Sequence, residues 1–147
     1  MPSQENPRAL IGWRLLALSY DLWPALALWM AAAALFTVLH GNQPLAAFSG
    51  GQIALWLLCW TLTGAYAVIS WRRGGQTLGM RPWRLRVTGH DDAPAAMRAL
   101  LQRYVIGTLS LLLVGAGFWW AWIDRDRLTW HDRASGTRLR RIANPAT

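Results

Sequence analysis

Three long runs of apolar residues dominate the chain, and they are separated by short polar segments. The runs are Leu15–Leu39, Ile53–Trp71 and Tyr104–Ile123. Each is about 19–25 residues long, and a helix needs about 20 apolar residues to cross the hydrocarbon core of a bilayer. The second and third runs contain no charged residue, whereas a helix of that length on a soluble protein has a polar face. The pattern predicts an all-α membrane protein with three apolar helical segments.

The third run allows two arrangements. Gly115 and Gly117 allow the helix to break into a re-entrant pair. Tyr104 at one end and a group of tryptophans at the other are instead typical of a full span. Arg84–Val87 and Thr137–Ile142 read as short strands, and they could pair only if the tail lies on the same side as the polar link before the third run. We favour that arrangement.

The link between the second and third runs sets the predicted orientation. Short loops rich in arginine stay in the cytoplasm, which predicts a cytoplasmic N-terminus, an external turn over residues 40–52 and localisation to an inner (plasma) membrane. Ala93–Gln102, with Pro94 near its first turn, is predicted to form a separate amphipathic helix on the membrane surface. The arginines of the link are Arg72, Arg73, Arg81, Arg84, Arg86, Arg98 and Arg103.

Composition narrows the partners and the chemistry. The net charge of +8 would suggest nucleic acid binding in a soluble chain, but the arginines flank membrane segments, so anionic lipid headgroups are the expected partner and nucleic acid is not. The three histidines, His40, His90 and His131, lie in separate segments without metal-ligand spacing. No nucleophile-elbow pattern is present. We therefore predict no metal, no cofactor, no catalytic residue and no enzymatic activity.

One carboxylate, Asp21, lies inside the first apolar run, seven residues after Arg14. An aspartate near the centre of a membrane helix costs about 2.5–3.5 kcal/mol on insertion scales. Such residues usually face a protein interior and mark a pathway, a relay or an ion pair. Seven residues are about two helical turns, which predicts that Arg14 and Asp21 share one face. Pro24 lacks an N–H and frees the carbonyl of Tyr20 beside this carboxylate.

Several ordered pieces of the chain resemble the RDD family of bacterial membrane proteins, which is named for one arginine and two aspartates. By this resemblance Arg14 and Asp21 are the arginine and the first aspartate, and Asp132 is assigned as the second. The resemblance implies an N-terminal arm over residues 1–12, a membrane domain over 13–142 and a tail over 143–147. The pieces that carry it, besides Arg14 and Asp21, are Gly75–Arg81, Gly117–Trp119, Asp124, Thr129–Arg133, Gly136 and Thr137.

Two hypotheses for function remain open. In the first, which the resemblance suggests, the chain has a transport-related role for a cation, a proton or an unknown ligand. Asp21 would then be the site, and a homo-oligomer would supply the volume that three helices lack. In the second, the chain is a structural or assembly protein in which Arg14, Asp21 and Asp132 form a stabilising ion-pair network, with His131 beside it.

Overall fold

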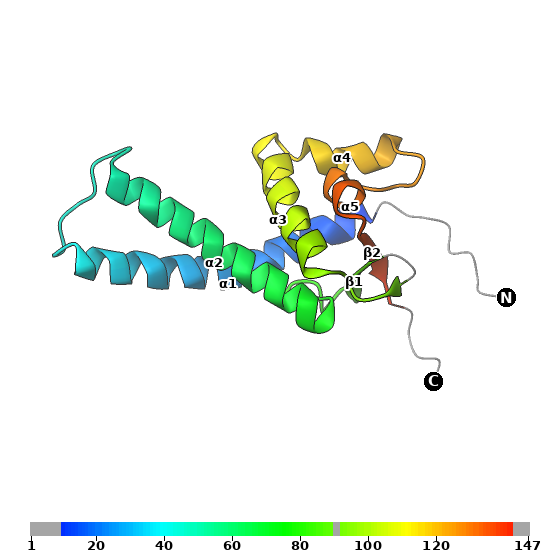
Figure 1. Ribbon diagram of the computed structural model, residues 1–147, viewed down its shortest axis with the longest axis horizontal. Coiled ribbons are helices and arrows are strands. Elements are labelled where there is room, and N and C mark those ends of the chain that lie inside the picture. The colour runs from blue at the N-terminus through cyan, green and yellow to red at the C-terminus, as the bar shows by residue number, and fades with distance from the viewer. Residues whose placement is uncertain (1–9, 90–91, 143–147) are drawn as a thin grey trace.

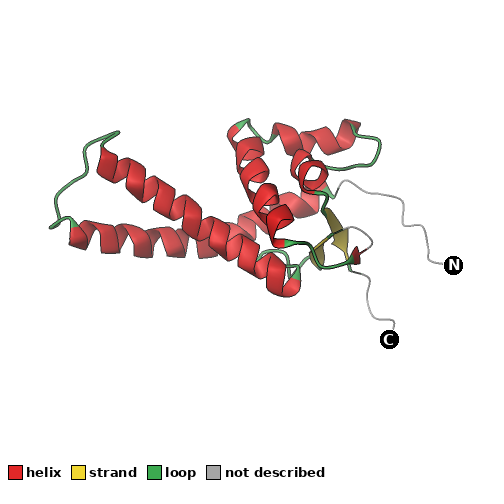
Figure 2. Cartoon of the chain, in the orientation of Figure 1, coloured by secondary structure: helices red, strands yellow, loops and turns green. Residues whose placement is uncertain are grey.

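The computed structural model describes residues 10–89 and 92–142, so most of the predicted arm and all of the predicted tail lie outside the described residues. Two long helices form a hairpin that projects from a smaller body of shorter helices and two strands (Figure 1; Figure 2). The elements are α1 (Ile11–Leu39), α2 (Gly50–Gly74), β1 (Leu85–Thr88), α3 (Met97–Leu112), α4 (Ala116–Ile123), α5 (Trp130–Ser135) and β2 (Arg138–Arg141).

The first two apolar runs form α1 and α2, and both helices are long and apolar enough to cross a membrane. The α2 helix begins where the Ser49 hydroxyl accepts a hydrogen bond from the backbone N–H of Gln52, a standard N-cap. It ends at Gly75, whose φ of 70° is left-handed, a conformation that glycine adopts without steric cost. The prediction of two membrane-length helices joined by a turn is confirmed.

The third apolar run is broken, as one of the two predicted arrangements required. Helices α3 and α4 meet at an angle of 97°. Gly115, with a φ of 73°, turns the chain between them. Gly117 lets α4 lie against α3, because a Cβ added there would come within 2.5 Å of the Ser110 hydroxyl. By length and composition this bent pair would form a third, broken span or a re-entrant loop.

The surface helix predicted over Ala93–Gln102 is not a separate element. Residues 93–96 are not helical, and Met97–Gln102 form the first turns of α3 itself. The reason is packing: Leu100 is fully buried and Arg103, one turn further, is 5% exposed, so this end of α3 enters the core instead of lying on a membrane surface.

The two strands pair antiparallel, with Leu85 opposite Arg141 and Val87 opposite Leu139. This confirms the predicted strand pair with boundaries that differ by about one residue. The pairing places the chain after the last helix at the same end of the molecule as the α2–β1 link (Figure 1). The main apolar core lies against this small sheet; besides Leu85, Val87 and Leu139, its buried members include Ala17, Val68, Met80, Ala95 and Leu100.

Several charged side chains are buried in this fold, while many large apolar side chains are exposed. Arg14, Arg103 and Asp132 are at most 5% exposed, whereas Leu16 is 41% and Leu109 53% exposed. In water, apolar side chains are the ones most often buried and unpaired charges almost never are. Exposed leucine and tryptophan together with buried, paired charges are stable where the surroundings are lipid. The fold is therefore that of an all-α membrane protein with a small two-stranded sheet.

Candidate functional site

A buried ion-pair cluster joins the two ends of the described chain. Nη2 of Arg14, near the start of α1, donates to Oδ2 of Asp132 in α5 at 2.5 Å. Arg103 of α3 donates through Nη1 to Oδ1 of the same carboxylate and to the Thr137 hydroxyl at 2.8 Å. Asp132 is 1% exposed. One carboxylate thus holds three helices together.

The position of Asp132 is set by the start of α5. The Thr129 hydroxyl accepts a hydrogen bond from the backbone N–H of Asp132, and the Asp132 carboxylate accepts one from the backbone N–H of Thr129. This capping box satisfies two free N–H groups of the helix end and fixes the carboxylate. Gly136, with a φ of 62°, ends the helix and leads into β2.

The charges around Asp132 determine its ionisation. Burial opposes the charged form, but the guanidinium groups of Arg14 and Arg103 outweigh it and hold the pKa of Asp132 well below its usual range. Its neighbour His131 responds in the opposite sense: burial, reinforced by the charge of Arg103, lowers the pKa of His131 to about 3. The cluster therefore contains an ionised aspartate and a neutral histidine.

The tautomer of His131 follows from its partner. Nη1 of Arg14 lies 3.3 Å from Nε2 of His131, and a guanidinium can only donate. Nε2 is therefore the acceptor, and the proton of the neutral ring is on Nδ1. The ring packs against Phe118 with a centroid distance of 4.8 Å, so His131 contributes an acceptor for Arg14 and an apolar face for α4.

Asp21 forms a second, separate group. Its Oδ1 accepts hydrogen bonds from the Tyr66 hydroxyl at 2.7 Å and from the backbone N–H of Gly79 at 2.9 Å. Its Oδ2 accepts one from the Thr77 hydroxyl. Gly79 is required here because an added Cβ would lie 2.2 Å from the carbonyl oxygen of Ala17. The turn after α2 thus packs directly on the α1 backbone and delivers neutral donors to the carboxylate.

Arg14 and Asp21 bind different partners. Among the described residues, the hydrogen bonds to Asp21 come from α2 and the following turn, and Arg14 reaches Asp132 instead. The two residues do share one side of α1, but their partners approach from different elements. Tyr20 packs edge-on against the Trp83 ring at 5.8 Å, and Tyr66 provides the hydroxyl for Asp21. Pro24 lies inside α1, as predicted.

Sequence reasoning missed three partners: Arg103, Tyr66 and Thr77. Arg103 is the last of the link arginines, and it directly precedes an apolar run in the same way that Arg14 does. Tyr66 stands amid an uncharged span, and a lone tyrosine there carries no periodic signal. Thr77 lies in the Gly75–Arg81 segment, which carries the family resemblance but gives no sign of a contact with Asp21. Its direct contact with α1 depends on the close approach at Gly79, which no local pattern reveals.

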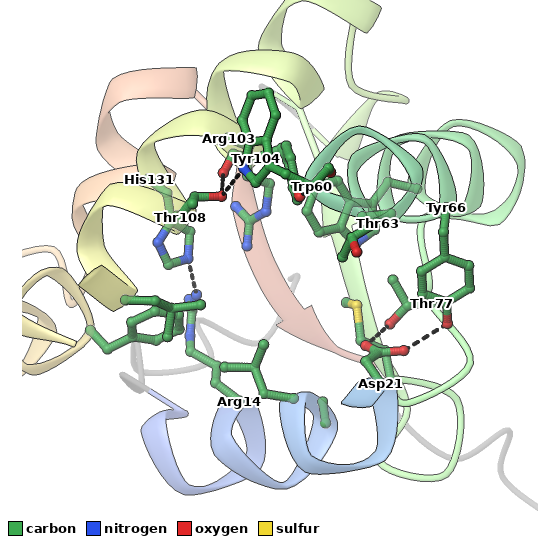
Figure 3. A pocket seen from close by; sticks show the side chains of 18 of the residues that line it. Arg14, Asp21, Trp60, Thr63, Tyr66, Thr77, Arg103, Tyr104, Thr108 and His131 are labelled. Carbon is green, nitrogen blue, oxygen red and sulfur yellow. Dashed lines mark hydrogen bonds between the residues drawn. The ribbon is translucent and has the colours of Figure 1, made fainter. Parts of the chain in front are cut away.

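A cavity of about 660 Å³ connects the two polar groups. Arg14, Arg103 and His131 line it on one side, and Asp21 lines it with Tyr66 and Thr77 on the other (Figure 3). The rest of its wall is mostly aromatic and aliphatic, from α1, α2 and α3; it includes Trp29, Trp56, Trp60, Tyr104 and Leu111. The volume falls within the range of about 300–1,000 Å³ typical of small-molecule sites.

The fold and the site together define the class: an α-helical membrane protein with a buried arginine–aspartate cluster beside a cavity. Within the described ranges, no group of three or more His, Cys, Asp or Glu side chains is placed to hold a metal ion. The profile of the RDD family matches residues 8–136, and the chain belongs to this family. No curated protein and no solved structure matches the chain.

Proposed function

We propose that this RDD-family protein has a transport-related role and works through the cavity, with Asp21 as its functional carboxylate. The observation that carries the proposal is the position of Asp21: an ionisable group within a membrane-length apolar helix, half-buried on a cavity wall. Intramembrane carboxylates of this kind mark ion, proton and substrate pathways.

The donors to Asp21 support this assignment. All three are neutral: two hydroxyls and one backbone N–H. A carboxylate paired with a guanidinium loses that ion pair when it takes up a proton or a cation. Hydroxyl groups can rotate and also accept hydrogen bonds, so the surroundings of Asp21 adjust to a change of charge at a lower cost. Asp21 is thus suited to exchange, whereas Asp132 is not.

The proposal extends to orientation and partners. We place the arginine-rich end in the cytoplasm of a bacterium, with α1, α2 and the bent α3–α4 pair forming a multi-pass protein of the inner membrane. The pairing of β1 with β2 supports this, because it gathers the arginines of both polar segments at one end. Anionic lipids are the expected contact of that end. A homo-oligomer would complete the pathway, and no enzymatic step is invoked.

Cation-dependent proton flux in proteoliposomes tests the role of Asp21. We expect Asp21→Asn to reduce flux to the level of empty liposomes, because the amide cannot take up a proton or pair with a cation. The matched control is Asp126→Asn, which neutralises a carboxylate that is 60% exposed and outside the cavity lining. Flux that is unchanged by Asp21→Asn, with normal yield of the variant, would remove Asp21 from the mechanism.

A specific observation favours a second candidate, a structural or assembly role. The Asp132 carboxylate is paired with both Arg14 and Arg103, and the three side chains are at most 5% exposed; such a cluster fixes how helices assemble. If reconstituted protein carries no flux while Asp132 variants fail to fold, the structural role is the better description of the chain.

A further inference from the structure

The cavity is chemically different at its two ends. At the end inside the hairpin, the polar tips of the wall are already engaged. Nε1 of Trp29 donates to the Thr63 hydroxyl at 2.8 Å, and Nε1 of Trp60 donates to the Thr108 hydroxyl at 3.2 Å. These walls therefore offer a ligand little besides apolar ring faces and side-chain carbon.

At the other end, two residues of the cavity wall carry donors that have no partner among the described residues. Nε1 of Trp71 is buried and has no hydrogen-bond partner among the described residues. Arg103, whose guanidinium lies 5.5 Å from the centroid of the Trp71 ring, forms both its hydrogen bonds through Nη1. No described residue accepts a hydrogen bond from Nη2 or Nε of Arg103. A buried indole N–H normally has a partner, so this end is built for a group that accepts hydrogen bonds.

The two ends also lie at different depths. Arg14 and Trp29 both line the cavity and are fifteen residues apart on α1, which is about 22 Å along a helix. One leaflet of the hydrocarbon core is about 15 Å thick, half of the whole. The donor end lies near the start of α1, where the headgroup region would be, and the apolar end reaches past the level of one leaflet. Trp56 and Trp60 line this apolar end, and they are 52% and 40% exposed on the surface of the protein.

We infer that the cavity binds a single-chain lipid: an acyl chain along the aromatic wall, and a carboxylate or ester whose oxygens accept hydrogen bonds from Trp71 and Arg103. A head that only donates, such as an ammonium, finds no acceptor in Trp71 or Arg103; the carboxylate of the cavity wall, Asp21, lies on the opposite side. This inference rests on the proposed function, since it names the ligand class of the same cavity, but binding can be measured without any flux.

The test is photolabelling of the full chain in detergent with palmitate that carries a diazirine at its methyl end. We expect adducts on the cavity walls around Trp29 and Leu111, and we expect excess unlabelled palmitate to displace the probe. Competition by methyl palmitate equal to that by palmitate identifies an ester, and so a membrane lipid, as the source. Competition by palmitate alone identifies a free fatty acid. Equal competition by hexadecylamine in the Asp21→Asn variant, which lacks the carboxylate that would bind an ammonium, overturns the proposal.

The variant Trp71→Phe removes one donor and keeps a ring of similar shape. We expect it to raise the palmitate concentration for half-displacement about tenfold, the loss expected for one hydrogen bond to a charged group. Trp122→Phe is the control, since Trp122 is 59% exposed and lies outside the cavity lining. The proposal is overturned if the photolabelled adducts in the unmodified chain spread over outward leucines such as Leu15 and are not displaced by unlabelled palmitate. This outcome does not depend on the folding yield of the variant. If proteoliposomes show no flux while palmitate still labels the cavity, the proposed function fails and the lipid-binding proposal stands.

Discussion

Two aspartates of this molecule are held in opposite ways. Asp132 is 1% exposed and lies between the guanidinium groups of Arg14 and Arg103. Asp21 is half-buried beside the cavity and accepts hydrogen bonds from Tyr66, Thr77 and a backbone N–H. The first carboxylate is neutralised by fixed charges, and the second is only solvated by neutral donors.

Under the proposed function, this difference separates a carboxylate that stabilises the fold, Asp132, from one that acts in transport, Asp21. A sealed ion pair loses several kcal/mol when one partner is removed, because the other is left buried and charged. A carboxylate with neutral donors leaves no such charge behind. We therefore expect substitutions at Asp132 to act on folding and those at Asp21 to act on function.

The largest expected effect is that of Asp132→Asn. The amide has the shape of the carboxylate but no charge, so Arg14 and Arg103 would remain buried with their ion-pair partner lost. We expect a loss of about 3–5 kcal/mol in the free energy of unfolding, seen as a lower midpoint in detergent melting experiments. Asp21→Asn, measured alongside, should lose clearly less. Equal losses in the two variants would show that the cluster and the Asp21 group are one structural network.

Gly79→Ala probes the contact between the α2–β1 turn and α1. The added Cβ would come within 2.2 Å of the Ala17 carbonyl oxygen, so the turn must shift and weaken the hydrogen bonds to Asp21. We expect about 1–3 kcal/mol of destabilisation, the usual range for overpacking. Gly74→Ala is the matched control, because nothing lies within 4 Å of the Cβ it would add. A neutral result for both variants would show that the turn is not held against α1.

Acid should destabilise the protein through His131. Its pKa in the folded state is about 3, against about 6.5 in an unfolded chain. Between these values only the unfolded state binds the proton, so stability is full above about pH 6.5 and falls as the pH decreases, by up to about 1.4 kcal/mol per unit. Melting between pH 7 and pH 5 should show this slope reduced in His131→Gln, which keeps an acceptor for Arg14. A slope unchanged in that variant would show that His131 does not titrate on unfolding.

The sequence predicted much of the fold and about half of the site. Apolar runs revealed α1 and α2, and glycine at 115 allowed the break before α4, because these signals are local. The partner of Arg14 could not be read from spacing: a shared helix face pointed to Asp21, whereas α5 brings Asp132 to Arg14 from more than a hundred residues away. Contacts that depend on tertiary packing, such as that of Arg103 with Asp132, leave no periodic trace.

The smallest effect is expected at the exposed ion pair of Arg140 and Asp92, with an N–O distance of 2.9 Å and side chains that are 49% and 58% exposed. It joins the same residue types as the buried cluster, and only its surroundings differ. An exposed pair contributes about 0.2–1 kcal/mol and is screened by salt. Arg140→Ala should therefore lower the melting midpoint slightly at low salt and leave it unchanged at high salt. A loss of stability as large as that of Asp132→Asn would mean that burial does not set how much an ion pair contributes to stability. Burial could then no longer be used to tell the stabilising aspartate, Asp132, from Asp21.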